Sequence, residues 1–87
     1  MRHKVGDRVK IKSIDWYKDN MDDNGYIFFG HHMFDEDMSK LCGKTMTISY
    51  ITQYGVIAMV ENEYYWTEEM IACKIIEVEE NEYNKNN

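Results

Sequence analysis

Proline is absent from the 87 residues of this chain. A chain without proline has no PxxP segment and no polyproline linker, since both are built from that residue. Cysteine is scarce, because Cys42 and Cys73 are the only two and neither belongs to a CxxC motif. Two small buried thiols in a reducing compartment are therefore expected, and one disulfide between them is the alternative.

Long apolar runs are missing as well. No segment approaches the roughly 20 apolar residues of a transmembrane helix, and the opening Met-Arg-His-Lys is not followed by the apolar stretch of a signal peptide. We therefore expect a cytoplasmic protein without a membrane partner. The hydrophobic content of 44% suffices for one globular domain. We assign residues 4–78 to this domain and residues 79–87 to an acidic, Asn-rich, frayed tail.

Positive charge is scarce in the second half of the chain. The formal net charge is −6, and residues 51–87 hold two Lys/Arg against eight Glu. An acidic protein does not attract a phosphate backbone, which argues against nucleic acid as a partner. Weak nucleic-acid binding through Arg8, Lys10 and Lys12 is one alternative, and a solvated strand face is the simpler interpretation of these residues.

The patterns that are present predict a β-rich fold. Residues 4–14 alternate, with Val9 and Ile11 on one face and basic residues on the other, which indicates a half-buried strand. Residues 43–70 predict a three-stranded antiparallel meander with strands at 44–51, 56–61 and 64–66. In its first strand the residues expected on one face are Met46, Ile48 and Tyr50. A one-turn helix capped by the Thr67 hydroxyl and a closing strand at 73–78 follow.

A long excursion separates the first strand from the meander. We expect a helical turn with Asp15 as its N-cap, a turn at Asn24-Gly25, and a short strand or packed loop edge at residues 26–29. Residues 33–43 predict a short helix with one apolar face, made by Phe34, Met38 and Leu41.

Three segments carry a resemblance to a known set of proteins: residues 4–9 (Lys-Val-Gly-Asp-Arg-Val), residues 38–48 and residues 66–70 (Trp-Thr-Glu-Glu-Met). Together they resemble small SH3-like proteins from phages and prophages of Gram-positive and gut bacteria. The resemblance implies an SH3-like barrel of about five strands, with a helix in its long first loop and a one-turn helix before the last strand. It also implies an accessory protein of a phage or mobile element, and it carries over no catalytic residue.

Two constellations imitate metal sites, and neither is complete. Residues 20–27 place oxygens and a glycine as an EF-hand loop does, but its twelfth position is His31 instead of the required Glu. The adjacent His31 and His32 point apart on an extended chain, whereas zinc needs converging ligands. We expect no metal and no cofactor. No nucleophile elbow, HExxH motif or phosphate loop occurs, so we expect no enzyme.

Aromatic residues are more numerous than a small barrel can bury, and exposed aromatic clusters mark interfaces. We expect a partner-binding groove where residues 16–29 meet the meander, lined by Trp16, Tyr17, Tyr26, Tyr54 and Tyr65. The alternative for Trp16 and Phe28 is that they only hold the excursion against the barrel. The leading hypothesis is a noncatalytic protein-binding module, monomeric or weakly dimeric.

The acidic second half supports a different hypothesis. A small acidic protein can inhibit a host nucleic-acid enzyme by presenting carboxylates where phosphates would bind. The candidates for such a surface are Glu61, Glu63, Glu68, Glu69, Glu77 and Glu79.

Overall fold

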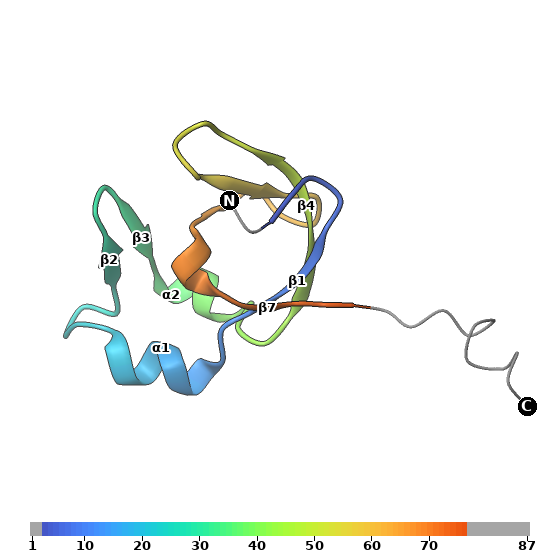
Figure 1. Cartoon of the computed structure of the whole chain (residues 1–87). Helices are drawn as coiled ribbons and strands as arrows, with labels where there is room; N and C mark the ends of the chain where they lie inside the picture. Colours follow the sequence, from blue (N-terminus) through green and yellow to red (C-terminus); the bar gives the residue numbers. More distant parts are fainter. Residues whose placement is uncertain (1–2, 77–87) are drawn as a thin grey trace, which may run out of the picture.

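The computed structural model describes residues 3–76, which form a small, mainly-β fold (Figure 1). The main sheet is antiparallel and five-stranded, in the order β6-β5-β4-β1-β7, and a second sheet pairs β2 with β3. The strands are β1 (Arg8–Ile11), β2 (Ile27–Phe29), β3 (His32–Phe34), β4 (Thr45–Ile51), β5 (Ile57–Met59), β6 (Tyr65–Trp66) and β7 (Ile71–Lys74). The helices are α1 (Ile14–Asn20), α2 (Glu36–Ser39) and the 3-10 helix η1 (Glu68–Met70).

Strand β1 has the alternation that the sequence predicts. Val9 and Ile11 are fully buried, whereas Arg8 and Lys10 are exposed. The strand lies between β4 and β7 and pairs with both. The predicted meander β4-β5-β6 is also confirmed, and all three residues of its central strand are buried.

One residue of β4 points the other way from the prediction. Met46 and Ile48 are buried, but Tyr50 is 47% exposed. The pairing with β5 explains the difference, because Ile48 pairs with Met59 while Tyr50 pairs with the next residue, Ala58. This bulge inserts one extra residue into β4 and turns Tyr50 to the outer face.

The C-terminal part departs from the prediction in two details. Strand β7 begins at Ile71, two residues before the expected start at 73, because Ile71 is buried opposite Ile11. Thr67 is the N-cap residue of η1, as predicted, but its hydroxyl is buried without a hydrogen-bond partner, and its N–H donates to Met70 Sδ at 3.4 Å. Residues 77–78 of the predicted strand and the predicted tail 79–87 lie outside the described residues.

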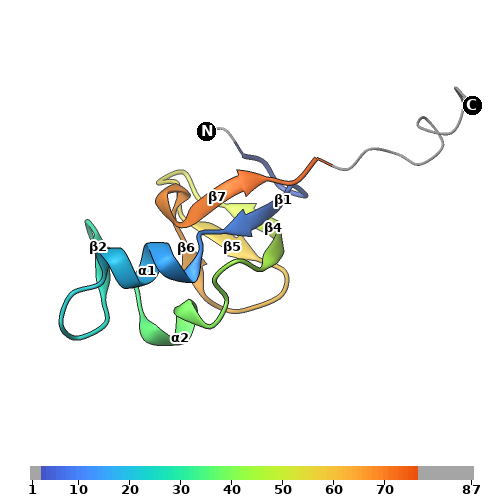
Figure 2. The ribbon, with the colours of Figure 1, turned by 90° about the horizontal axis from the view of Figure 1, so that it is seen from below.

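Within residues 3–76, β6 and β7 are the outer strands of the main sheet, and no pairing closes it into a barrel. Figure 2 shows the excursion, with α1, β2 and α2, beside the sheet and apart from β7. The excursion therefore forms a second layer next to the sheet instead of a loose loop.

Side-chain caps decide where the helices of the excursion begin. Helix α1 starts two residues earlier than predicted, because the Ser13 hydroxyl, and not the Asp15 carboxylate, caps it and accepts the Trp16 N–H at 3.1 Å. The helix predicted over 33–43 is reduced to α2, because Asp35 caps it through the Met38 N–H at 2.9 Å and His32–Phe34 pair with β2. The first loop thus contains two helices and a hairpin, where the sequence predicted a helical turn, a short strand or packed loop edge, and one short helix.

The Phe34 side chain joins the excursion to the main sheet. Its ring centroid lies 5.1 Å from that of Trp16, 5.6 Å from Tyr17 and 6.0 Å from Trp66, the buried residue of β6. Trp16 therefore holds the excursion in place, as one interpretation of the sequence expected. Phe28 does not share this role, since it is 62% exposed.

Both cysteines are free, and only one of them is even partly buried. Burial raises the pKa of the Cys42 thiol. Cys73 is exposed, contrary to the expectation of two buried thiols, because it lies opposite Lys10 on the solvent face of an outer strand.

Candidate functional site

The structure divides the five aromatic residues predicted to line one groove between different surfaces. Trp16 is half-buried and Tyr17 is only 6% exposed, both against Phe34. Tyr26 lies beside β2, 36% exposed, whereas Tyr54, in the turn between β4 and β5, is 84% exposed. Tyr65, on β6, is 58% exposed.

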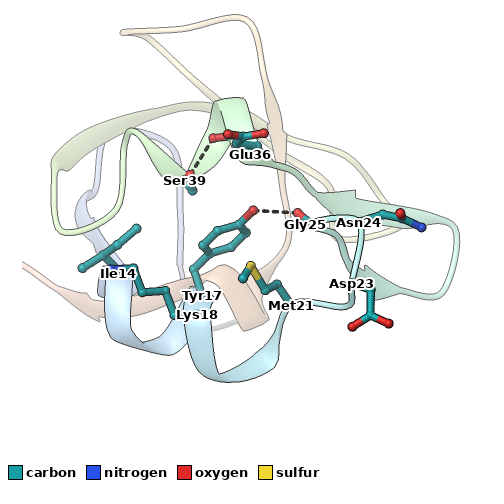
Figure 3. A pocket seen from close by; sticks show the side chains of 9 residues that line it. All are labelled: Ile14, Tyr17, Lys18, Met21, Asp23, Asn24, Gly25, Glu36 and Ser39. Atoms are coloured by element: carbon teal, nitrogen blue, oxygen red, sulfur yellow. Dashed lines mark hydrogen bonds between the residues drawn. The ribbon is translucent and has the colours of Figure 1, made fainter.

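A pocket of about 420 Å³ lies between α1, the turn after it and α2 (Figure 3). Tyr17 stands at its centre and donates its hydroxyl proton to the Gly25 carbonyl at 2.7 Å. Burial, together with the negative charges of Glu36, Asp35 and Asp22, raises the pKa of Tyr17. Residues 15–32 therefore form their pocket with α2, and not with Tyr54 and Tyr65. The other lining residues are Ile14, Lys18, Met21, Asp23, Asn24 and Ser39.

Substitution of Gly25 tests how tightly this pocket is built. Its φ is +86°, and an added Cβ would lie 3.0 Å from the Tyr17 hydroxyl oxygen. Gly6 has a similar φ of +91° but nothing within 4 Å of an added Cβ. We expect Gly25→Ala to cost more than the roughly 1–3 kcal/mol of backbone strain that Gly6→Ala costs. Urea denaturation measures both, and equal losses would contradict the contact. Adding Tyr17→Phe to Gly25→Ala should recover part of the difference.

The turn whose sequence resembles an EF-hand loop is closed by its own Asp22 side chain. Asp22 Oδ1 accepts the N–H groups of Asn24 at 2.9 Å and Tyr26 at 3.0 Å. The carboxylate thus closes an Asx turn, which is how Asp stabilises such loops. Within residues 3–76 there is no group of three or more His, Cys, Asp or Glu side chains arranged to hold a metal ion.

The β2–β3 ribbon carries an exposed apolar face, which we call the hairpin face and define as Tyr26, Phe28 and Met33. Phe28 and Met33 are cross-strand partners, so their side chains share one side of the ribbon. They are 62% and 46% exposed, and the Tyr26 ring lies 5.8 Å from that of Phe28. The other side of the ribbon, with Ile27 and Phe34, is buried.

Acidic residues border the hairpin face. Tyr26 shares a depression of about 190 Å³ with Asn24, Asp35, Glu36 and Asp37. Asn24 and Glu36 also line the α1–α2 pocket, so the two depressions are neighbours. The sequence interpretation missed Met33, because the helix predicted over 33–43 concealed the second strand. The continuous apolar run at residues 27–29 was the one available signal for this ribbon.

The charged residues of the main sheet neutralise one another in part. Glu61 accepts the Thr47 N–H at 2.8 Å and the Thr47 hydroxyl at 3.0 Å. Burial raises the pKa of Glu61, but these bonds and the nearby Arg8 outweigh burial and leave the pKa lowered. The Lys12 ammonium lies 6.0 Å from the Trp16 ring centroid. At least Glu61, Arg8 and Lys12 of the two candidate charged surfaces are therefore engaged by neighbours within the chain.

Comparison of the chain with protein-family models, with curated proteins and with solved structures finds no match. Among the described residues, no helix is both long and apolar enough to cross a membrane.

Proposed function

We propose that this chain is a noncatalytic protein-binding module with an SH3-like barrel fold, and that it is an accessory protein of a phage or mobile element acting in the bacterial cytoplasm. The order of the elements supports the fold assignment. A long excursion separates β1 from β4, the strands β4, β5 and β6 follow one another in the sheet, and η1 precedes β7, which returns to β1. The barrel is an open one, with β6 and β7 at its edges.

The observation that carries the binding function is the hairpin face. Moving a large aromatic side chain such as Phe28 out of water is favourable, so leaving it exposed costs free energy. Here Phe28 is exposed together with its cross-strand partner Met33 and with Tyr26, as a contiguous group. Contiguous exposed apolar groups of this kind are typical of protein interfaces.

The surrounding charge indicates the chemistry of the partner. Residues 15–37 contain seven Asp/Glu residues and one lysine. A partner segment with apolar side chains for the hairpin face and Lys or Arg for its acidic border is complementary to this surface. The α1–α2 pocket, which shares Asn24 and Glu36 with that border, gives room for one further side chain.

Affinity capture with surface variants tests the proposal. The immobilised chain should recover a protein from a lysate of its host cell, and the double variant Phe28→Ser, Met33→Ser should weaken that binding at least about tenfold, as expected for interface anchors. Val60→Ser is the matched control, because Val60 is 66% exposed on the main-sheet side of the molecule. Binding should also weaken as salt is added. A partner held equally by the double variant, or none recovered by the unmodified chain, would refute the proposal.

Neither alternative from the sequence has an equally specific observation in its favour. Charge mimicry needs carboxylates that line one face, but Glu61 is bonded to Thr47 and Glu68 lies 3.9 Å from His3 on a different element. Nucleic-acid binding needs free basic side chains, and Arg8 is close enough to Glu61 to lower its pKa.

A further inference from the structure

Tyr50, Ala58 and Tyr65 lie in one row across β4, β5 and β6. Ala58 pairs with Tyr50 on one side and with Tyr65 on the other, so the three side chains share the outer face. Two strand spacings separate the tyrosine backbones by roughly 10 Å. Because Ala58 is small, the two tyrosine side chains lie close together above it, near enough for Tyr65 to raise the pKa of Tyr50. Ala58 is left only 8% exposed beneath them.

Tyr64 is held beside this row by contacts of its own. Its ring stands edge-on to the buried Trp66 ring at 6.2 Å. Its N–H donates to Asn62 Oδ1 at 3.1 Å, and the same oxygen accepts the Trp66 Nε1–H at 3.1 Å. Tyr64 is thus held in place, and all three tyrosines remain 37–58% exposed. A rigid aromatic group that stays open to solvent loses little conformational entropy when it binds a ligand.

The three tyrosines line one depression of about 460 Å³, which we call the tyrosine site. Ser49, Asn62 and Glu63 are among its other lining residues. Glu63 is its one charged residue, and no Lys or Arg lines it. Aromatic ring faces carry negative electrostatic potential, and a carboxylate adds to it. The site is therefore suited to a cation and unsuited to an anion.

We propose that the tyrosine site binds the ammonium or guanidinium group of a lysine or arginine side chain presented by a partner protein. The cation lies over the tyrosine rings, and Glu63 balances its charge. The inference rests on the proposed function only in assigning the cation to a protein. The tyrosine site and the hairpin face have no residue in common, so each is tested separately.

The test is a titration of the whole ¹⁵N-labelled chain, at constant ionic strength, with N-acetyl-lysine amide and N-acetyl-arginine amide. Saturable amide shifts at Tyr50, Tyr64 and Tyr65 are expected, with a Kd of about 1–10 mM for so small a probe. N-acetyl-citrulline amide is the neutral counterpart of the arginine probe and should bind at least about fivefold more weakly. Equal binding of citrulline, or no saturation by either cation, would overturn the proposal.

Variants separate the contributions of charge and ring. Glu63→Gln should weaken the cation about threefold or more, and Tyr65→Leu about tenfold. Glu69→Gln is the matched control, because Glu69 is an exposed glutamate on η1 outside the site, and it should leave the Kd unchanged. If Tyr65→Leu does not fold, the Glu63→Gln comparison decides, since Glu63 is an exposed loop residue. Cation binding that survives Glu63→Gln unchanged would refute the role of the carboxylate.

Partner capture distinguishes this proposal from the proposed function. If the cations do not bind but capture still depends on Phe28 and Met33, the tyrosine site alone is refuted. If the cations bind and capture fails, the protein-binding function through the hairpin face is refuted while the cation site stands.

Discussion

Replacing Phe34 by alanine is expected to lower the free energy of unfolding by about 3–5 kcal/mol, the usual cost of truncating a buried phenylalanine. Phe34 is fully buried, and its ring contacts Trp16, Tyr17 and Trp66. Truncation therefore removes the main aromatic connection between the excursion and the main sheet. The cavity is expected to stay partly open, because the three neighbouring rings are held by other contacts as well.

The matched control is Phe28→Ala in the same hairpin. Phe28 is 62% exposed, so its truncation should change stability by no more than about 0.5 kcal/mol. Urea denaturation followed by far-UV circular dichroism measures both variants. Hydrogen exchange should further show that Phe34→Ala loses protection in α1 and β2 before it does so in β4. Similar losses for the two phenylalanines would contradict the assignment of Phe34 as the link between the two layers.

Replacing Asn62 by alanine is expected to cost about 2–3 kcal/mol, since the side chain makes several hydrogen bonds and two of its partners, Met46 and Trp66, are buried. Asn62 Oδ1 accepts from Trp66 Nε1 and from the Tyr64 N–H, and its Nδ2 lies 3.1 Å from Met46 Sδ. Trp66 is fully buried, so its Nε1–H would be left without an acceptor. The loss of that acceptor should also change the near-ultraviolet circular dichroism of the tryptophan.

Asn24→Ala is the control for this substitution. Asn24 is exposed in the turn after α1, where its backbone N–H, and not its side chain, is bonded to Asp22. Its truncation should cost less than about 0.5 kcal/mol. Because Asn62 also holds Tyr64, Asn62→Ala should weaken cation binding at the tyrosine site, whereas Asn24→Ala should not. Equal stability of the two variants would show that the loop before β6 is not organised by Asn62.

The strands of the main sheet were predictable from local pattern, and the excursion was not. In β1 the alternation of Val9 and Ile11 with basic residues indicates a strand and nothing else, because a period of two suits only a strand. The spacing of Phe34 and Met38 fits one face of a helix, yet both side chains are buried in the observed fold, where His32–Phe34 are extended. Two nonlocal facts decide the outcome: β3 pairs with β2, and the Asp35 carboxylate caps a helix that starts only at Glu36.

For the candidate sites too, the sequence predicted one part and nonlocal contacts decided the rest. The surplus of aromatic residues, visible in the sequence, predicted that some of them would be exposed, and Tyr54 and Tyr65 are. The sequence did not indicate which aromatics would gather. Trp16 and Tyr17 turn inward because Phe34 lies within reach of α1, a contact between segments about 17 residues apart. Phe28 and Met33 meet only because of the strand register.

The sequence by itself determined the β-rich class, the half-buried alternation of β1, the turns and the acidic balance, since each depends on neighbouring residues or on composition. Tertiary structure decided where the binding surfaces lie. The bulge in β4 places Tyr50 opposite Ala58 instead of in the core, and a strict alternation would have buried it with Met46 and Ile48. A bulge depends on how two strands pair, so one strand's pattern does not contain it. The tyrosine site exists because of that single inserted residue.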